Sequence, residues 1–367
     1  MSQIVNNVKA NLKSFVCSIA YSPMVDKIIS SLGVVKIWAD LHVYSSKKKL
    51  LASAKKAFEE ETSVGTFEDY KKALEKHWVS YSEYANMYEF YKKTEEERDE
   101  YVSRLKMAYF YWRYTPGVAK AVFRNKTRFL KTFEKYVYRK WIYAPDTSFE
   151  DFTKFISKYD CIVKPCDGKL GKGIFKVYKD DKHLDIKKLY HLCVKERKLV
   201  EQCIEAHEEL KAFHPQSLNT LRVVTVSNKK KAEVFGSLLK MGVGDKVVDN
   251  AHAGGLIAQI NIKTGEIESE GTNTNGESFT YHPDTKIKIK GYKIPNWNLI
   301  CKTCCEAAQL IGNPITGWDV AINSSGNIEL VEGNYGPDFD GMQSPLQIGV
   351  KKSIYAMIKE YCGIEMR

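Results

Sequence analysis

Two apolar segments near the C-terminus carry acidic side chains and constrain the fold more than any other feature. The segments GWDVAI and ELVEGN flank a turn-forming Ser-Ser-Gly-Asn run, which predicts an antiparallel hairpin. Glu332 and Asn334 are two residues apart and share one strand face, which the hairpin places opposite Asp319. Solvated acids on edge strands are the alternative, but the apolar neighbours predict burial, where an unpaired carboxylate is costly. Two carboxylates and an amide oxygen are suitable ligands for Mg²⁺ bound with nucleotide phosphates.

The rest of the chain divides into a helical part and a part that alternates strands and helices. Helical spacing of apolar residues runs from residue 52 to 107, with breaks near Gly65 and Thr94. After a turn at Thr115-Pro116-Gly117, another helix is expected over residues 118–140. Thr147 and Glu150 predict a capping box for a helix that continues through residue 157.

The second part begins after residue 159 and has the short, β-rich segments of an α+β protein. Strands are expected at residues 161–164, 173–178, 198–201, 221–226, 232–243, 256–269 and on both sides of the turn at 324–327. Helices are expected at residues 185–195, 297–311 and 345–361.

A segment rich in glycine and lysine, IVKPCDGKLGKGIF, joins two of the expected strands. Glycines such as Gly171 and Gly173 let backbone N–H groups approach phosphate oxygens, and Lys164, Lys169 and Lys172 supply positive charge. The segment lacks the GK[ST] sequence opening a helix that defines a Walker A loop. A simple glycine turn is the alternative, so by itself the segment only suggests phosphate binding.

The segment LVEQCI ends the next expected strand. An acid followed by a short apolar run suits an adenine slot, in which the backbone bonds the base and Glu201 accepts a hydrogen bond from its amino group. Taken alone this pattern carries little information. In this order, and together with HPQSLNTLRVVTV, VDNAHAGGL and YHPDT, the segments resemble the ATP-grasp superfamily. Within it the chain looks like the sugar-transfer-associated ATP-grasp proteins of bacterial surface-polysaccharide gene clusters.

The resemblance covers about residues 125–350 and does not extend over the first 100 residues or so. It implies an α+β ATP-grasp fold, in which two α+β subdomains clasp ATP. The predicted division is a helical, basic and aromatic region at 1–145, a subdomain with the glycine-rich lid and adenine slot at 146–205, and a subdomain with the metal and phosphate site at 206–367.

The resemblance also implies roles for individual residues. The residues expected to bind ATP are Lys164, Lys169, Gly171, Lys172, Gly173, Glu201, Gln202, Ile204 and Glu208. Those expected to hold Mg²⁺, as two ions, are Asp319, Glu332 and Asn334. The transferred phosphoryl group would be stabilised by Arg222 and Lys240, and Arg222 and Asn250 would face the γ-phosphate and the bound carboxylate. The residues expected beside the acceptor are His252, Gly254, Gly255 and His282. Lys240 stands where relatives usually have arginine, which weakens bidentate phosphate contact.

The implied activity is an ATP-dependent, ADP-forming carboxylate–amine ligase with an acylphosphate intermediate. Its substrates would be a small-molecule carboxylate and an amine, one of them on a nucleotide- or lipid-linked sugar of a bacterial surface polysaccharide. One alternative is an ATP-grasp kinase that phosphorylates a hydroxyl group. Another is a non-catalytic ATP-binding partner of a glycosyltransferase, although such a protein has no need to keep all three metal ligands.

The net charge of +11 is concentrated in one segment. Residues 104–143 contain eleven Lys and Arg but a single acid, Glu134, and aromatic residues are interleaved with them. The segment is either a surface for phosphates or an anionic membrane, or a helical layer whose aromatic residues are core and whose basic residues face water. Nucleic acid is not expected as a partner, because the ATP-grasp region is near neutral. Neither an export signal nor an apolar stretch of about 18 residues is present, so we expect a cytoplasmic protein with peripheral membrane contact as an option.

Overall fold

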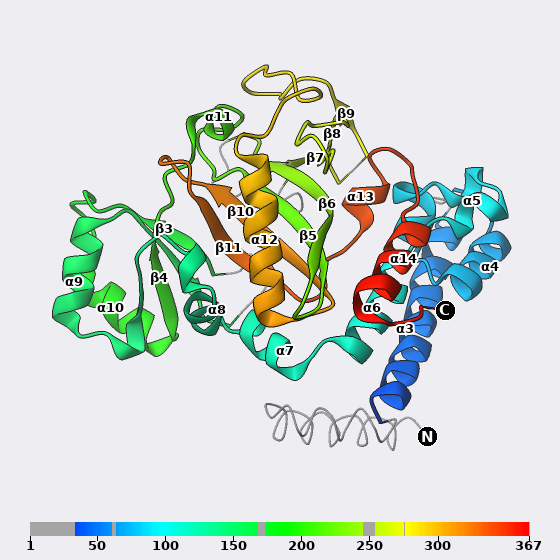
Figure 1. Ribbon diagram of the computed structural model, residues 1–367, viewed down its shortest axis with the longest axis horizontal. Coiled ribbons are helices and arrows are strands. Elements are labelled where there is room, and N and C mark those ends of the chain that lie inside the picture. Colours follow the sequence, from blue (N-terminus) through cyan, green and yellow to red (C-terminus); the bar gives the residue numbers. More distant parts are fainter. Residues whose placement is uncertain (1–33, 61–63, 168–172, 245–253, 275, 367) are drawn as a thin grey trace.

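A computed structural model of the protein describes residues 34–60, 64–167, 173–244, 254–274 and 276–366. Helices from the N-terminal part lie at one end of the molecule, a small sheet with its helices lies at the other end, and a large sheet lies between them (Figure 1). No helix within these ranges is long and apolar enough to cross a membrane.

The helical part consists of one long helix and a series of short ones. They are α3 (Val34–Glu59), α4 (Phe67–His77), the π-helix η1 (Glu83–Met87), the 3₁₀-helix η2 (Phe90–Lys92), α5 (Glu95–Asp99), α6 (Arg104–Tyr114), α7 (Gly117–Arg124), α8 (Lys126–Thr132) and the 3₁₀-helix η3 (Glu134–Tyr136). The breaks predicted near Gly65 and Thr94 are confirmed, since the first lies between α3 and α4 and the second is the N-cap of α5.

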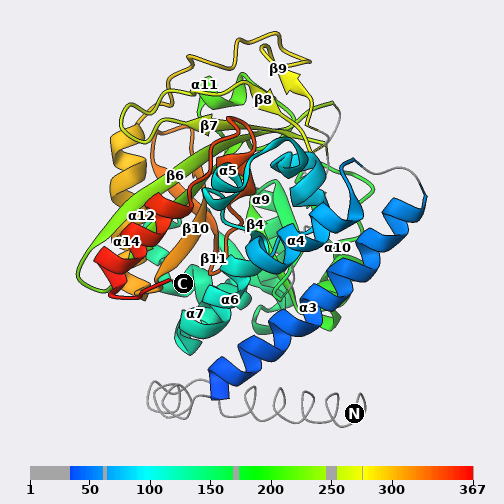
Figure 2. The ribbon, with the colours of Figure 1, turned by 90° about the vertical axis from the view of Figure 1, so that its right-hand side faces the viewer.

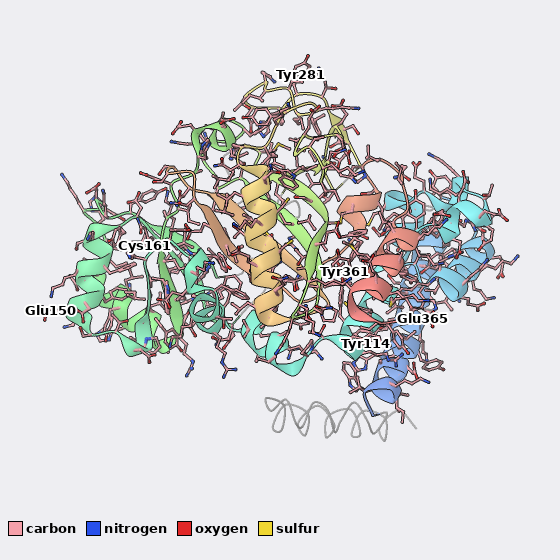
Figure 3. The ribbon with its side chains drawn as sticks, viewed as in Figure 1. Tyr114, Glu150, Cys161, Tyr281, Tyr361 and Glu365 are labelled. Carbon is pink, nitrogen blue, oxygen red and sulfur yellow. The ribbon has the colours of Figure 1, made fainter. Side chains whose placement is uncertain are left out.

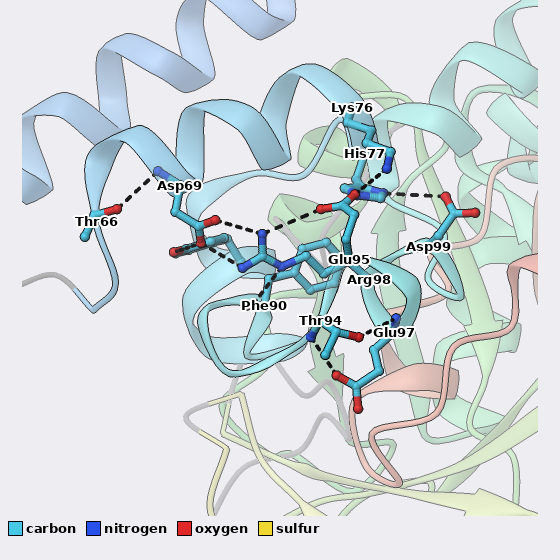
Figure 4. Close-up of polar contacts among 11 residues, drawn as sticks. Thr66, Asp69, Lys76, His77, Phe90, Thr94, Glu95, Glu97, Arg98 and Asp99 are labelled. Atoms are coloured by element: carbon cyan, nitrogen blue, oxygen red, sulfur yellow. Dashed lines mark hydrogen bonds and ion pairs between the residues drawn. The ribbon is translucent and has the colours of Figure 1, made fainter.

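Polar contacts hold the short helices together (Figure 4). Arg98 is buried and forms a bidentate pair with Asp69 at 2.8 and 2.7 Å, while its Nε donates to the carbonyl of Phe90 at 2.9 Å. His77 is also buried and lies 2.6 Å from Glu95. Burial lowers the pKa of this imidazole. Short helices are marginal alone, so this network supplies the tertiary contacts that such helices need.

The small sheet is antiparallel with the order β1-β4-β2-β3. Its strands are β1 (Trp141–Tyr143), β2 (Cys161–Pro165), β3 (Phe175–Val177) and β4 (Lys198–Gln202), and its helices are the 3₁₀-helix η4 (Ala144–Asp146), α9 (Phe149–Lys158) and α10 (Ile186–Lys195). Cys161 lies in the core between this sheet and its helices, whereas Glu150 on α9 faces outward (Figure 3). The opposite face carries Lys164 and Glu201 together with Leu199, which packs into the core of the large sheet.

The large sheet has seven antiparallel strands in the order β11-β10-β5-β6-β7-β8-β9. They are β5 (Thr220–Ser227), β6 (Ala232–Met241), β7 (Leu256–Ile260), β8 (Gly271–Thr272), β9 (Ser278–Phe279), β10 (Ile315–Ile322) and β11 (Ile328–Asn334). The accompanying helices are α11 (Glu208–Lys211), α12 (Trp297–Ile311), α13 (Asp340–Gln343) and α14 (Lys351–Cys362). One face packs on α12, and part of the other packs on α6, α13 and α14 (Figure 2).

Several predicted boundaries are wrong. The helix expected over 118–140 is interrupted at Asn125, whose backbone is extended and whose side chain caps α8 by accepting from the N–H of Arg128 at 2.9 Å. Ser148, rather than Thr147, caps α9, because its hydroxyl accepts from the N–H of Asp151 at 3.1 Å. The last helix begins at Lys351 rather than at residue 345.

The domain boundary predicted at residue 145 would place β1 in the helical region, apart from the small sheet to which it belongs. Trp141 to Tyr143 pair with Leu199 to Glu201 of β4, so this strand is the edge of the small sheet.

Candidate active site

The hairpin predicted around the acidic residues is present in the large sheet. In the pairing of β10 with β11, Asp319 lies directly opposite Glu332, and Gly317 lies opposite Asn334. The neighbours Trp318 and Val320 are fully buried in the core beneath α12, so the alternation of a strand directs Asp319 to the other face. A shift of register directly after Asp319 bends the strand at this point.

Two cations surround the carboxylate of Asp319. On the next strand Arg222 is its direct partner and forms a bidentate contact, with Nε and Nη2 at 2.7 and 3.2 Å from the two oxygens. From β6, the ammonium of Lys240 lies 3.0 Å from Oδ1. Burial alone would raise the pKa of Asp319, but Arg222 and Lys240 lower it to about 2. The structure therefore brings Asp319 and Glu332 together, as the hairpin expected from the sequence requires. Arg222 and Lys240 join them from β5 and β6.

Lys164 and Glu201 form a second charged pair on the inner face of the small sheet. Glu201 pairs in register with Ile162, two residues from Lys164, so both side chains point the same way. The ammonium of Lys164 contacts Oε2 of Glu201, and Arg139 lies 2.9 Å from Oε1. Burial alone would raise the pKa of Glu201, but Arg139 and Lys164 hold it below its usual value. Because both oxygens are occupied and the side chain is buried, Glu201 holds Lys164 here, which differs from the predicted bond to adenine.

A small slot lies between the two sheets. Its polar lining comes from Lys126, Lys164, Glu201 and Glu332, and its apolar lining is contributed by Phe123, Phe129, Leu130, Val331 and Gly333. Lys126 is only 12% exposed and its ammonium lies 3.9 Å from Glu332. The slot thus places two lysines of the small sheet and α8 beside an acid of the hairpin.

Sequence reasoning missed Lys126 and Arg139 as site residues. Both lie in the basic segment at residues 104–143, several of whose aromatic residues are core, whereas Tyr138 is exposed. Phe123, Phe129 and Phe133 cluster around Trp318 with ring centroids 4.9 to 6.3 Å apart. In the sequence, only the concentration of positive charge marked this segment. That signal does not tell which basic side chains point into the protein and which face solvent.

Several predicted site residues lie outside the described residues, namely Lys169, Gly171, Lys172, Asn250 and His252. Gly173 and Gly254 are described and have positive φ angles of 72° and 95°, a conformation that favours glycine. Gly255 is buried directly before β7.

The residues predicted to line the adenine and ribose sites follow β4. Gln202 ends the strand, and its backbone N–H donates to the carbonyl of Lys140 at 2.8 Å. Ile204 is half-buried in the connection to the large sheet. Glu208 opens α11 with its side chain 86% exposed, 3.6 Å from Lys211. These residues lie on the connection between the sheets, where a nucleotide could reach them.

His282 is placed differently from the acceptor role expected for it. The ring is fully buried, and Nε2 lies 2.8 Å from the carbonyl of Gly242 while Nδ1 faces the N–H of Asp284 at 3.4 Å. Burial lowers the pKa of this histidine. The ring therefore joins two loops and is not open to a substrate in this conformation.

By their chemistry the hairpin acids suit a hard cation bound together with phosphates, but Arg222 and Lys240 engage both oxygens of Asp319, so a cation would share or displace these contacts. Among the described residues, no three His, Cys, Asp or Glu side chains gather as a metal-binding group. Asp319 and Glu332 supply two carboxylates, and Asn334 lies opposite Gly317 on the same hairpin. Further oxygen ligands would have to come from a bound nucleotide or water, which is how Mg²⁺ is usually held.

Comparison with models of protein families finds one match. A family model described as sugar-transfer associated ATP-grasp matches residues 109–359. No curated protein matches the chain.

Many solved structures are similar. The ATP-grasp ligase PsnB with a minimal precursor is 15% identical and has a TM-score of 0.41, with 67% of this chain and 63% of that chain covered. For N5-carboxyaminoimidazole ribonucleotide synthetase from Thermotoga maritima the identity is 11% and the TM-score 0.41, covering 73% and 58%. For an L-amino acid ligase from Bacillus licheniformis they are 14% and 0.40, covering 72% and 57%. This chain thus spans less than two thirds of each of the three. Because the family model matches more than half of its length, the protein belongs to the sugar-transfer associated ATP-grasp family.

Proposed function

We propose that this protein is an ATP-dependent, ADP-forming carboxylate–amine ligase. The observation that supports it most is the facing arrangement of charges on the two sheets. Asp319 and Glu332 lie side by side on the hairpin, with Arg222 and Lys240 against Asp319. Lys126 and Lys164 line the slot beside Glu332. Acids for a cation and lysines for phosphates thus meet between the sheets.

The residues suggest how such a reaction would proceed. The bond between the β- and γ-phosphates breaks, ADP leaves, and a substrate carboxylate oxygen takes the phosphoryl group to form an acylphosphate. An amine then attacks the carbonyl carbon, a C–N bond forms, inorganic phosphate leaves and the amine proton passes to solvent. Bound Mg²⁺ would neutralise phosphate charge, held by Asp319, Glu332 and Asn334.

The cations of the site have separate tasks in this scheme. Lys126 and Lys164 would bind the phosphates that remain with ADP. Arg222 presents a fixed fork that suits the three oxygens of a phosphoryl group, and Lys240 adds a point charge beside it. Donors held in place before the reaction stabilise developing charge without having to reorganise. Asp319 orients both cations through its contacts.

We further propose that the substrates belong to the synthesis of a bacterial surface polysaccharide in the cytoplasm, with an amino acid or amine joined to a carboxylate on a nucleotide- or lipid-linked sugar. The match to a family associated with sugar transfer supports this choice. Contact with a glycosyltransferase or with the inner membrane surface is part of the same proposal.

The test is a coupled ADP-release screen of the purified protein with Mg²⁺-ATP, amino acids and sugar acids. ADP and inorganic phosphate formed together with an amide would support the ligase. A stable phosphorylated product would indicate a kinase instead. Nucleotide binding without ADP release over the whole panel would favour a non-catalytic partner and count against catalysis.

A further inference from the structure

Arg139 joins the two sheets through its guanidinium. Nε and Nη2 lie 3.0 and 2.9 Å from Oε1 of Glu201 on the small sheet. Nη1 donates to Oε1 of Glu329 at 2.8 Å and to the carbonyl of Leu330 at 3.0 Å, both on the large sheet. Nη2 also donates to the carbonyl of Val331 at 3.1 Å. The guanidinium, with its N–H groups in a fixed fork, makes four hydrogen bonds and one further ion-pair contact.

The surroundings of Arg139 form a closed set of buried charges. The side chains of Arg139, Glu201 and Glu329 are 3%, 4% and 2% exposed, and that of Lys164 is 9% exposed. Two carboxylates are thus balanced by one guanidinium and one ammonium. Removing one member of such a set leaves a buried opposite charge without a partner.

Each oxygen of the Glu201 carboxylate contacts a different cation. Oε1 belongs to Arg139, and Oε2 belongs to Lys164, whose ammonium also lines the slot between the sheets. The other charged groups near this ammonium are Lys126 and Glu332. Arg139 therefore fixes Glu201 through Oε1, and Glu201 in turn fixes the ammonium of Lys164 through Oε2.

We propose that Arg139 is a positioning residue for the bound nucleotide, which it serves by fixing Glu201 so that the ammonium of Lys164 is directed into the slot. This inference rests on the proposed function, because it takes Lys164 as a phosphate ligand. Arg139 touches neither nucleotide nor acceptor in this scheme.

The site requires the forked geometry of the guanidinium as well as its positive charge. A lysine at position 139 keeps one positive charge but offers three donors on a flexible stem, so it cannot reach both carboxylates and both carbonyls. We therefore expect Arg139→Lys to weaken binding of Mg²⁺-ADP by at least about tenfold, comparable with the loss of groups that orient metal ligands. The neighbouring Lys140 is exposed, and Lys140→Met serves as the matched control with unchanged affinity.

A double-mutant cycle on the full chain separates positioning from mere stability. Titration calorimetry with Mg²⁺-ADP is carried out on wild type, Arg139→Lys, Lys164→Met and the double variant. If Arg139 acts through Lys164, its replacement adds no further loss of affinity once Lys164 is gone. Equal losses in both backgrounds would overturn the inference. An Arg139→Lys protein that binds like wild type would overturn it as well.

Two further variants cover the case in which Arg139→Lys fails to fold. Glu201→Gln turns an acceptor of Lys164 into a group that also donates, so nucleotide affinity should fall. Glu329→Gln lies on the other side of Arg139 and leaves the pair of Lys164 and Glu201 intact, so it should lower the free energy of unfolding while affinity stays within about threefold. Affinity losses that follow stability alone in both variants would refute the inference. A wild-type protein that binds no nucleotide would instead refute the proposed function.

Discussion

Replacing Asp319 with asparagine removes the one negative charge that Arg222 and Lys240 share. The two cations lower the pKa of this carboxyl from 3.8 to about 2, a difference of 1.8. At 1.36 kcal/mol for each pKa unit, the ionised carboxylate contributes about 2 kcal/mol of stability at neutral pH. In Asp319→Asn the cations lose their counter-charge, so the free energy of unfolding should fall by about 2 kcal/mol or more.

The lowered pKa of Asp319 also predicts how the stability difference between wild type and variant depends on pH. A carboxyl whose pKa is lower in the folded state stabilises the fold fully above its unfolded value, and it loses that contribution as protons bind. The advantage of wild type over Asp319→Asn should therefore be constant from pH 7 to about pH 5, and should shrink as the pH falls from about 4 toward 2. Urea denaturation at a series of pH values measures it.

The same variant tests the site. Asp319→Asn should lose Mg²⁺-dependent release of ADP, and Mg²⁺-ADP should stabilise it less than wild type in thermal unfolding. Asp146→Asn is the matched control, because that aspartate is exposed on η4, and it should change neither property. A variant as stable as wild type at pH 7 would refute the electrostatic reasoning, and one with undiminished ADP release would refute the assignment of Asp319 to the site.

Three further substitutions examine the surroundings of the site. Gly333→Ala places a Cβ 2.4 Å from the ring of Phe123, so overpacking should cost about 1–3 kcal/mol in urea denaturation. Lys126→Met should weaken Mg²⁺-ADP binding by about tenfold or more in calorimetry, because it removes a charged donor from the slot, and unchanged affinity would exclude Lys126 as a phosphate ligand. Tyr111→Phe removes a 2.6 Å hydrogen bond to the carbonyl of Pro337 and should lower the unfolding free energy by about 1 kcal/mol, measured in urea at pH 7.

The sequence predicted those parts of the fold that depend on local pattern. The hairpin and most strands were found from alternation, and the family resemblance is confirmed by the match over residues 109–359. The break at Asn125 was missed because its capping side chain competes with a helical pattern that continues on both sides. The strand Trp141–Tyr143 was missed because three residues carry too little pattern, and only pairing with β4 makes them a strand.

The site was predictable where its residues share a hairpin and not where they come from distant segments. Asp319 and Glu332 are 13 residues apart, so one turn brings them together. Arg139 contacts Glu201 and Glu329, which lie 62 and 190 residues away, and this distance hides the arrangement from local spacing. For the same reason the ion pair that occupies Glu201 was not foreseen, and an open carboxylate was expected instead.

The helical region that precedes the family match is joined to the segment that follows β11. Tyr88 donates to one oxygen of Asp340, and Arg104 contacts the other. Gln343 Nε2 donates to the hydroxyl of Tyr88 and to the carbonyl of Val102, both at 2.9 Å.

All of these partners of α13 lie before residue 109, where the match begins. Asp340 is buried, so without Tyr88 and Arg104 its carboxylate would be left without compensation in the interior. The path of the chain from Asn334 to α13 is therefore set in part by residues outside the family match, and the helical region and the ATP-grasp region share one buried polar core.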